Sequence, residues 1–401
     1  MDRKKLIGFT ASFGIFFPFF GQSLPIGIHA RILSSLILIF SATMGIRYLK
    51  KYEFEKYQVL FFLLVLLLLG LEVLYSDSTQ INNLLALNYR NESYYENKLT
   101  MTYFSLLIAF LVCFMLAPIS FSRGFIEGFI QSFLLISFLV ISVSLNSSDH
   151  WFIDDYAAKK EYLENDKKFS QIYITVLHLL GVFYSLILFK SNDKKKIIFG
   201  LVLFLTSTIF IIIYQQRSAW MYLFFTMFIS SVLQGDFFSF VKQIFIFVFV
   251  VVSGFFIGLK VGVFNDSVLG YGNQIVSGEL LSSRTEAYEL AWSGFLENPM
   301  GNGYGGYSLY GFHPYPHNIV LESLYELGVF PTFILFIILL LSIVTVVRLF
   351  SFTKRYNDPR FFVLGLVIGY LFLVSMKAGD LSSTDVLFSV TLLFVSAVGK
   401  K

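Results

Sequence analysis

Apolar segments long enough to cross a lipid bilayer recur along the whole chain, and they constrain its fold more than any other feature. A spanning helix needs about 20 apolar residues, and hydropathy predicts about 12 such spans here. The predicted spans are 6–24, 30–48, 57–75, 101–121, 125–145, 169–190, 197–214, 217–234, 241–259, 327–350, 361–378 and 382–398. Only 14% of the 401 residues are charged, whereas a soluble domain carries about 25%. The sequence predicts an all-α polytopic membrane protein in which residues 1–401 form a single integral membrane domain.

Basic residues in the connecting loops predict how these spans are oriented, because Lys and Arg accumulate in cytoplasmic loops. With the N-terminus inside, the basic loops around Arg47, Lys195 and Lys354 face the cytoplasm. The longer and less basic loops then face the outside, and they are 76–100, 146–168 and 260–326. An even number of spans leaves both termini in the cytoplasm. We expect no cleavable signal peptide, and the net charge of +4 gives no reason to expect a nucleic-acid partner.

The loop 260–326 is the segment large enough for local structure of its own. Ser283-x-x-Glu286 is a capping-box pattern, which predicts a helix that begins at Arg284 and runs toward Asn298. Pro299 is expected to stop this helix. Aromatic residues near one face of the predicted helix are Tyr288, Trp292 and Phe295. Glycines that predict a tight turn after it are Gly301, Gly303, Gly305 and Gly306.

Three residues on or beside the outer loops could act on an anionic substrate. Arg284 would add a bidentate fork to the anion-binding start of a helix, although it could equally form a surface ion pair with Glu286 or Glu289. Arg217 occupies a minimal polar break between two spans, where an arginine needs a partner unless it snorkels to the headgroups. His317 lies near the start of a helix that enters the membrane. Histidine is the usual general base near neutral pH, and ordinary solvation is the alternative.

Two metal-binding interpretations are weaker. His313 and His317 are four residues apart, but the two prolines between them prevent the helix that would align both rings, and no third ligand is evident. Asp154 and Asp155 could bind a divalent cation, although acidic pairs are common in exposed loops. We therefore expect neither a metal nor a cofactor.

The order of these features resembles the O-antigen ligase and polymerase superfamily of bacterial inner membranes. Its pattern is about a dozen spans, an arginine at a short outer turn, and a long late outer loop that opens with an arginine. A glycine-rich turn follows, and then His-Asn with a glycine ten residues on. The matching positions here are Arg217, Arg284 and the segment from His317-Asn318 to Gly328, so that the specific part covers about 210–330. The ligase-type pattern continues with a small or hydroxylated residue three positions after that glycine, whereas this chain has Pro331.

The resemblance implies a metal-independent, inverting glycosyltransferase of GT-C-like fold that uses an undecaprenyl-pyrophosphate-linked donor at the periplasmic face. Arg217 and Arg284 would neutralise the departing pyrophosphate, and His317 would take the proton of the attacking sugar hydroxyl. The expected partners are undecaprenyl-pyrophosphate-linked glycans, membrane lipid and a chain-length regulator protein. Further residues expected to bind substrate are Asn318, Gly301, Gly303, Trp292 and Tyr288.

Three functions remain open at this point. An O-antigen polymerase joins lipid-linked repeat units, whereas a ligase passes the finished glycan to lipid A-core, and both need the same donor site. Pro331 favours the polymerase. A secondary transporter or a lipid-linked oligosaccharide flippase is the rival from another class. Transporters place charges near the bilayer midplane and show repeated halves, whereas here the charges fall at span ends and the halves look unlike.

Overall fold

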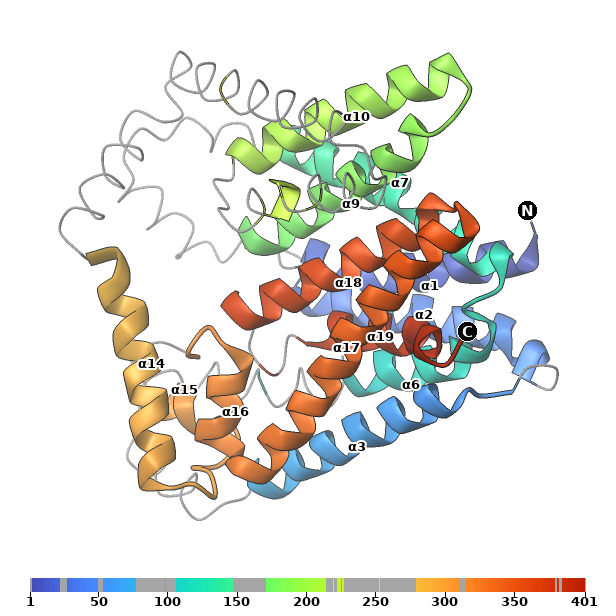
Figure 1. The fold of residues 1–401 in the computed structure, drawn as a ribbon. Helices are drawn as coiled ribbons and strands as arrows, with labels where there is room; N and C mark the ends of the chain where they lie inside the picture. Colours follow the sequence, from blue (N-terminus) through green and yellow to red (C-terminus); the bar gives the residue numbers. More distant parts are fainter. Residues whose placement is uncertain are drawn as a thin grey trace. The chain divides into compact units, whose positions relative to one another are not determined.

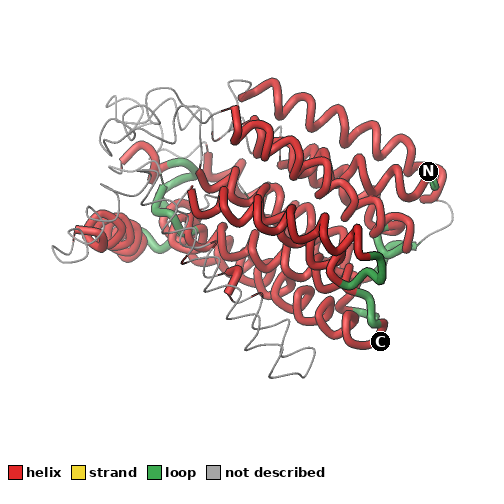
Figure 2. The backbone as a smooth tube through the Cα atoms, turned by 90° about the horizontal axis from the view of Figure 1, so that it is seen from above, coloured by secondary structure: helices red, strands yellow, loops and turns green. Residues whose placement is uncertain are grey.

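The structure is a computed structural model, and helices joined by turns make up the part of the chain that it describes. The described residues are 2–21, 27–49, 53–76, 98, 106–146, 171–213, 219, 222–224, 226, 252, 279–310, 315–378, 381 and 384–400. Within these ranges no residue is in a β-strand, which confirms the predicted all-α class (Figures 1 and 2). The helices are α1 (Arg3–Gly21), α2 (Gly27–Leu49), α3 (Lys56–Ser76), α6 (Leu107–Leu116), η2 (Ala117–Ile119), α7 (Arg123–Asn146), α9 (Gln171–Phe189), α10 (Lys194–Ile213), α14 (Glu279–Glu297), α15 (Gly306–Tyr310), α16 (Ile319–Leu327), α17 (Val329–Tyr356), α18 (Pro359–Ala378), α19 (Asp385–Phe394) and η5 (Val395–Val398).

Most predicted spans coincide with a helix, and several of these helices are long and apolar enough to cross a membrane. Among the described residues, five helices meet that length and composition: Ala30–Tyr48, Lys56–Ser76, Arg123–Leu145, Val329–Tyr356 and Pro359–Lys377. Shorter apolar helices cover Leu107–Ile119, Ile174–Phe189 and Asp385–Val398. The predicted spans 217–234 and 241–259 lie almost wholly outside the described residues.

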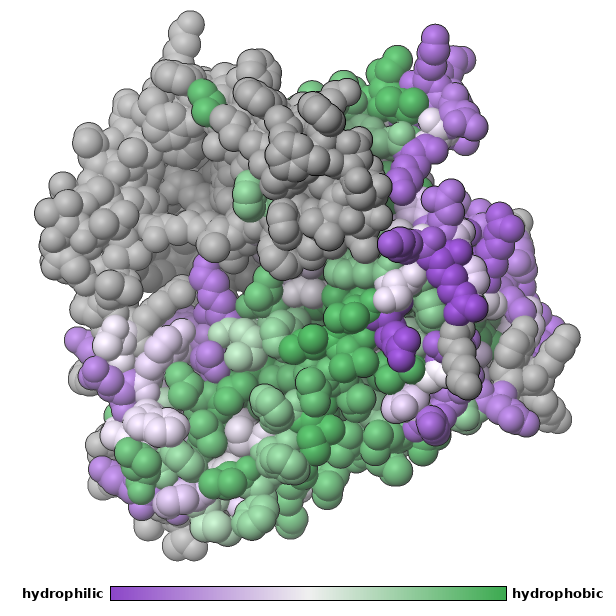
Figure 3. All heavy atoms as spheres, viewed as in Figure 1, coloured by the Kyte–Doolittle hydropathy of each residue, from purple (hydrophilic) through white to green (hydrophobic). Residues whose placement is uncertain are grey.

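The outer faces of the long helices are apolar, as lipid contact requires. Along α17, large apolar side chains are exposed at intervals of three or four residues, which places them in one stripe. They are Phe330, Phe333, Phe336, Leu340, Ile343 and Val347. The exposed residues of α3 include Val59, Leu60, Leu63 and Leu67. Figure 3 shows this face as a broad hydrophobic area over α3 and α17. A broad apolar surface of this kind is compatible with a membrane protein.

The chain packs as two compact units, each assembled from three separate stretches. Unit 1 comprises 1–37, 122–276 and 349–370, and unit 2 comprises 38–121, 277–348 and 371–401. In unit 1, α1 packs along α7, and α7 and α10 both pack on α9. Close contact between α1 and α7 depends on Gly8 and Gly128, because a Cβ atom on either would overlap a backbone carbonyl of the other helix. Small residues at helix crossings are typical of helices that pack in membranes.

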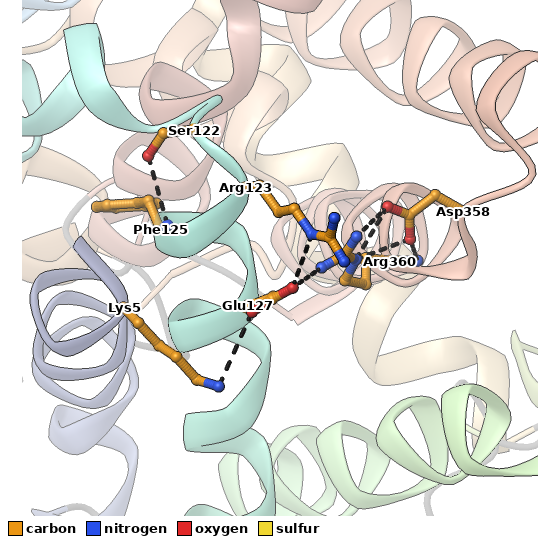
Figure 4. Close-up of polar contacts among 7 residues, drawn as sticks. All are labelled: Lys5, Ser122, Arg123, Phe125, Glu127, Asp358 and Arg360. Carbon is orange, nitrogen blue, oxygen red and sulfur yellow. Dashed lines mark hydrogen bonds and ion pairs between the residues drawn. The ribbon is translucent and has the colours of Figure 1, made fainter. Parts of the chain in front are cut away.

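An ionic cluster joins three helices of unit 1 at their polar ends (Figure 4). Glu127 on α7 pairs with Lys5 on α1 at 3.8 Å, with Arg123 at 3.1 Å and with Arg360 on α18 at 2.6 Å. Arg360 also binds Asp358, whose carboxylate accepts a hydrogen bond from the Arg360 backbone N–H at the start of α18. Burial raises the pKa of Asp358, but Arg360 outweighs burial and holds this pKa below its ordinary value.

Unit 2 contains the segment that the sequence singles out. Here α14 and α15 pack against α16, and α16 also contacts α3. Helix α19 packs on α6 and α3. Figure 1 shows α14 running alongside α15 and α16. The short helix α16 therefore packs against the two helices that precede it and against α3 from a distant part of the sequence.

Candidate functional site

Two of the three predicted catalytic residues are not fully described. Arg217 lies outside the described residues, as do His313, Asp154 and Asp155. Arg284 is described only as part of the backbone of α14. His317 is described completely, and so are the five residues that were expected to bind substrate.

The predicted start of the late helix is wrong. We expected the helix to begin at Arg284, but α14 already includes Glu279. The predicted end is confirmed, because α14 stops at Glu297, two residues before Pro299. Residues 279–282 are Glu, Leu, Leu and Ser, and three of these four residues favour or tolerate a helix well enough to extend it past the capping box. Arg284 consequently lies at least one full turn inside the helix. The unpaired backbone N–H groups of a helix belong to its first four residues, so they do not surround Arg284.

His317 and Asn318 form the start of α16. Asn318 is the N-cap, and its side-chain oxygen accepts hydrogen bonds from the backbone N–H groups of Val320 at 3.0 Å and Leu321 at 3.1 Å. His317 has a φ of 58°, in the left-handed region that residues other than glycine seldom adopt. Its ring is half-buried and meets the Tyr315 ring edge-on, with centroids 4.5 Å apart. An unusual backbone conformation at a polar residue is a marker of functional sites.

We expected His317 near the start of a helix that enters the membrane, but the helix that follows it is separate from α17, which matches the predicted span 327–350. Helix α16 ends at Leu327 after nine residues, and α17 begins separately at Val329. Gly328 makes the break with a φ of 77°. The hydroxyls of Ser323 and Thr332, 2.8 Å apart, link the two helices across it.

The glycine-rich turn packs against the opposite end of α16. Gly303 donates its N–H to the carbonyl of Glu326 at 2.9 Å, and Asn302 donates to Tyr325 at 2.8 Å. Gly301 and Gly303 both have positive φ, and a Cβ atom on Gly301 would lie 2.6 Å from the Glu326 carbonyl oxygen. A nine-residue helix is about 13 Å long, so the turn and His317 lie at opposite ends of α16. The structure explains these glycines by backbone packing.

The aromatic residues of α14 differ in how far their side chains are buried. Tyr288 is half-buried, whereas Trp292 is 49% exposed and lies beside Phe295, with ring centroids 5.4 Å apart. The buried face of α14 packs Ala291 against Tyr307 and Tyr325. Trp292 is thus available to stack on a sugar or to contact lipid.

A buried ionic cluster, which the sequence interpretation did not predict, lies along α16. The Lys98 ammonium is 2.8 Å from both carboxylate oxygens of Glu326 and also binds Glu322 directly. All three side chains are fully buried. The second oxygen of Glu322 accepts the backbone N–H of Leu381 at 2.9 Å, and the Lys98 ammonium lies 4.8 Å from the centre of the Tyr304 ring. We call Lys98, Glu322 and Glu326 the Lys98 cluster.

The Lys98 cluster places one ammonium group against two carboxyl groups. Burial raises the pKa of Glu326, and the Lys98 ammonium opposes this shift without cancelling it. Backbone N–H groups of Gly305 and Tyr307 add hydrogen bonds to the same carboxylate. Burial and the charge of Glu322 together raise the pKa of Tyr307 as well. One sequence signal pointed to this site, because Glu322 and Glu326 are two acidic residues one turn apart in a mostly apolar nine-residue segment.

Within the described residues, no group of three or more His, Cys, Asp or Glu side chains could hold a metal ion. The chain matches no known protein family and no curated protein.

Proposed function

We propose that the chain is a glycosyltransferase that polymerises undecaprenyl-pyrophosphate-linked O-antigen repeat units at the periplasmic face of the bacterial inner membrane. The observation that carries the proposal is His317, a half-buried histidine held in left-handed backbone directly before the N-cap of α16. It occupies the position of the His-Asn pair in the resemblance described above. The apolar exposed faces of α3 and α17 support the membrane location.

In the proposed reaction, a sugar hydroxyl of one lipid-linked repeat unit attacks the anomeric carbon of another. His317 takes the hydroxyl proton as the new C–O bond forms. The bond from the anomeric carbon to the pyrophosphate oxygen breaks, and its electron pair leaves with undecaprenyl pyrophosphate. Arg217 and Arg284 stabilise the negative charge that grows on this leaving group. A direct displacement of this kind inverts the anomeric centre and needs no metal.

The decisive experiment is a reaction with the purified full chain in detergent and a synthetic undecaprenyl-pyrophosphate-linked repeat unit. We expect products that grow by whole repeat units, in the presence of excess EDTA. Loss of activity in EDTA with recovery in magnesium would instead implicate Asp154 and Asp155 as ligands. In cells, deletion should leave single repeats on lipid A-core, whereas the complete absence of O-chain would indicate a ligase.

Transport is the second candidate, and the Lys98 cluster is the observation that favours it. Ionisable residues buried in membrane proteins often lie on ion or proton pathways. The purified chain in proteoliposomes would then move a lipid-linked oligosaccharide or an ion across the bilayer without changing its covalent structure. Translocation without polymer formation would select this alternative.

A further inference from the structure

The Lys98 cluster connects four separate stretches of chain. Lys98 lies at the end of the predicted outer loop 76–100, and Glu322 and Glu326 lie on one face of α16. Leu381 reaches the cluster through its backbone N–H. Tyr304, whose ring faces the Lys98 ammonium, belongs to the glycine-rich turn. Contacts from several directions on one face of a helix fix both its rotation and its position along its axis.

The cluster is linked directly to the start of α16. The backbone N–H of Glu322 donates to the carbonyl of Asn318 at 3.0 Å, in the first hydrogen bond of the helix. Asn318 is the N-cap and follows His317. A displacement of Glu322 therefore moves the residue that sets the direction of the His317 backbone. The three side chains of the cluster are fully buried, so they act on the start of α16 and do not contact substrate themselves.

We infer that Lys98 is a positioning residue: it holds α16 through Glu322 and Glu326 and thereby places His317 for its reaction. The inference rests on the proposed function and deepens it. Reacting groups must be placed to within a fraction of an ångström, and a displacement of about 1 Å far from the chemistry can cost about 100-fold in rate. An ionic cluster with several buried contacts gives α16 the rigidity that such placement needs.

The test must separate positioning from stability. Lys98→Met alone leaves two buried carboxylates without their ammonium, and it is expected to impair folding. The informative variant is Lys98→Met/Glu322→Gln/Glu326→Gln, which is uncharged and nearly isosteric. Its amide oxygens can still accept the backbone N–H groups of Leu381, Gly305 and Tyr307. Because well-packed neutral replacements of buried ion pairs are commonly tolerated, this triple variant should reach the membrane and melt near the wild-type temperature.

We expect the triple variant to lose at least about 10-fold in kcat while KM for the lipid-linked repeat unit changes by less than about twofold. Glu127→Gln is the matched control, because it disturbs the ionic cluster of unit 1 and should leave kcat unchanged. Wild-type kcat in the triple variant would overturn the inference and leave the cluster with a purely stabilising role. If the triple variant does not reach the membrane, Lys98→Arg keeps the charge and alters the geometry, and wild-type kcat in that variant would equally overturn it.

A second readout does not depend on activity. Backbone hydrogen exchange in residues 315–321 should be faster in the triple variant than in the wild type, since the start of α16 is then held less firmly. A wild-type chain that forms no polymer would refute the proposed function, but the exchange measurement would still decide whether the cluster holds α16. Unchanged exchange in an active enzyme would refute the positioning role alone.

Discussion

At the scale of single residues, His317 combines two properties that a substitution can separate. Its imidazole is the proposed base, and its backbone adopts a φ of 58°. Asparagine tolerates this conformation, whereas alanine is strained there. We expect His317→Asn to lose at least ~100-fold in turnover with an unchanged melting temperature. His317→Ala should lose as much activity and in addition about 1 kcal/mol of stability. Turnover and thermal unfolding of both variants measure the two effects.

His313→Ala is the control for this prediction. His313 lies outside the described residues and lacks the His-Asn context, so its substitution should be nearly silent. If His313→Ala proved as damaging as His317→Asn, the assignment of the base would be wrong.

Asn318 shows how far a sequence motif can be interpreted without a structure. The His-Asn pair suggested substrate binding, but the Asn318 side chain already caps α16 through two backbone N–H groups. Asn318→Ala should therefore cost about 1 kcal/mol in unfolding free energy. Asn318→Asp and Asn318→Ser can also cap the helix, so these variants should retain most of the unfolding free energy that Asn318→Ala loses. A large loss of substrate affinity in Asn318→Asp, with full stability, would instead restore the binding role.

At the scale of elements, hydropathy predicted most helices because a spanning segment must be both long and apolar. It also predicted the span 327–350, which matches α17, but not the break at Gly328 that separates α17 from the short helix after His317. The start of α14 was wrong for a different reason, since a capping-box pattern also fits the interior of a helix whose preceding residues favour helix. The Lys98 cluster was not predicted because Lys98 lies more than 220 positions before the two glutamates, and the spacing of the glutamates alone does not identify their partner.

The backbone passes close to itself at Gly301 and Gly328. A side chain at Gly328 should therefore lower the stability of the protein. A Cβ atom on Gly328 would lie 2.5 Å from the carbonyl oxygen of Pro299, and its φ of 77° with a ψ of −167° is a conformation that only glycine adopts readily. Gly328→Ala should cost at least about 1–3 kcal/mol from backbone strain alone. Gly70→Ala is the matched control, because nothing lies within 4 Å of the added methyl group, and it should change stability by less than about 1 kcal/mol. Equal melting temperatures for the two variants would contradict this close approach.

At the scale of the whole molecule, the predicted orientation can be tested with probes that the structure helps to choose. Ser293 on α14 and Asn192 before α10 are both exposed, and Cys113 is buried. On a Cys113→Ala background, Ser293→Cys should react with an impermeant thiol reagent in intact spheroplasts, because α14 belongs to the predicted periplasmic loop. Asn192→Cys should react only after the membrane is opened, because basic residues follow it. The reverse labelling would invert the topology and exclude a periplasmic His317.

One ammonium shared by two buried carboxylates also restricts the order in which these positions can change during evolution. A lineage that first loses Glu326 keeps the balanced pair of Lys98 and Glu322. A lineage that first loses Lys98 passes through a chain whose two buried glutamates have lost their shared ammonium, which selection for folding should remove. Natural relatives that lack a lysine at position 98 should therefore also lack at least one of the two glutamates. A comparison of their sequences at these three positions can reveal that ancestry without a single assay.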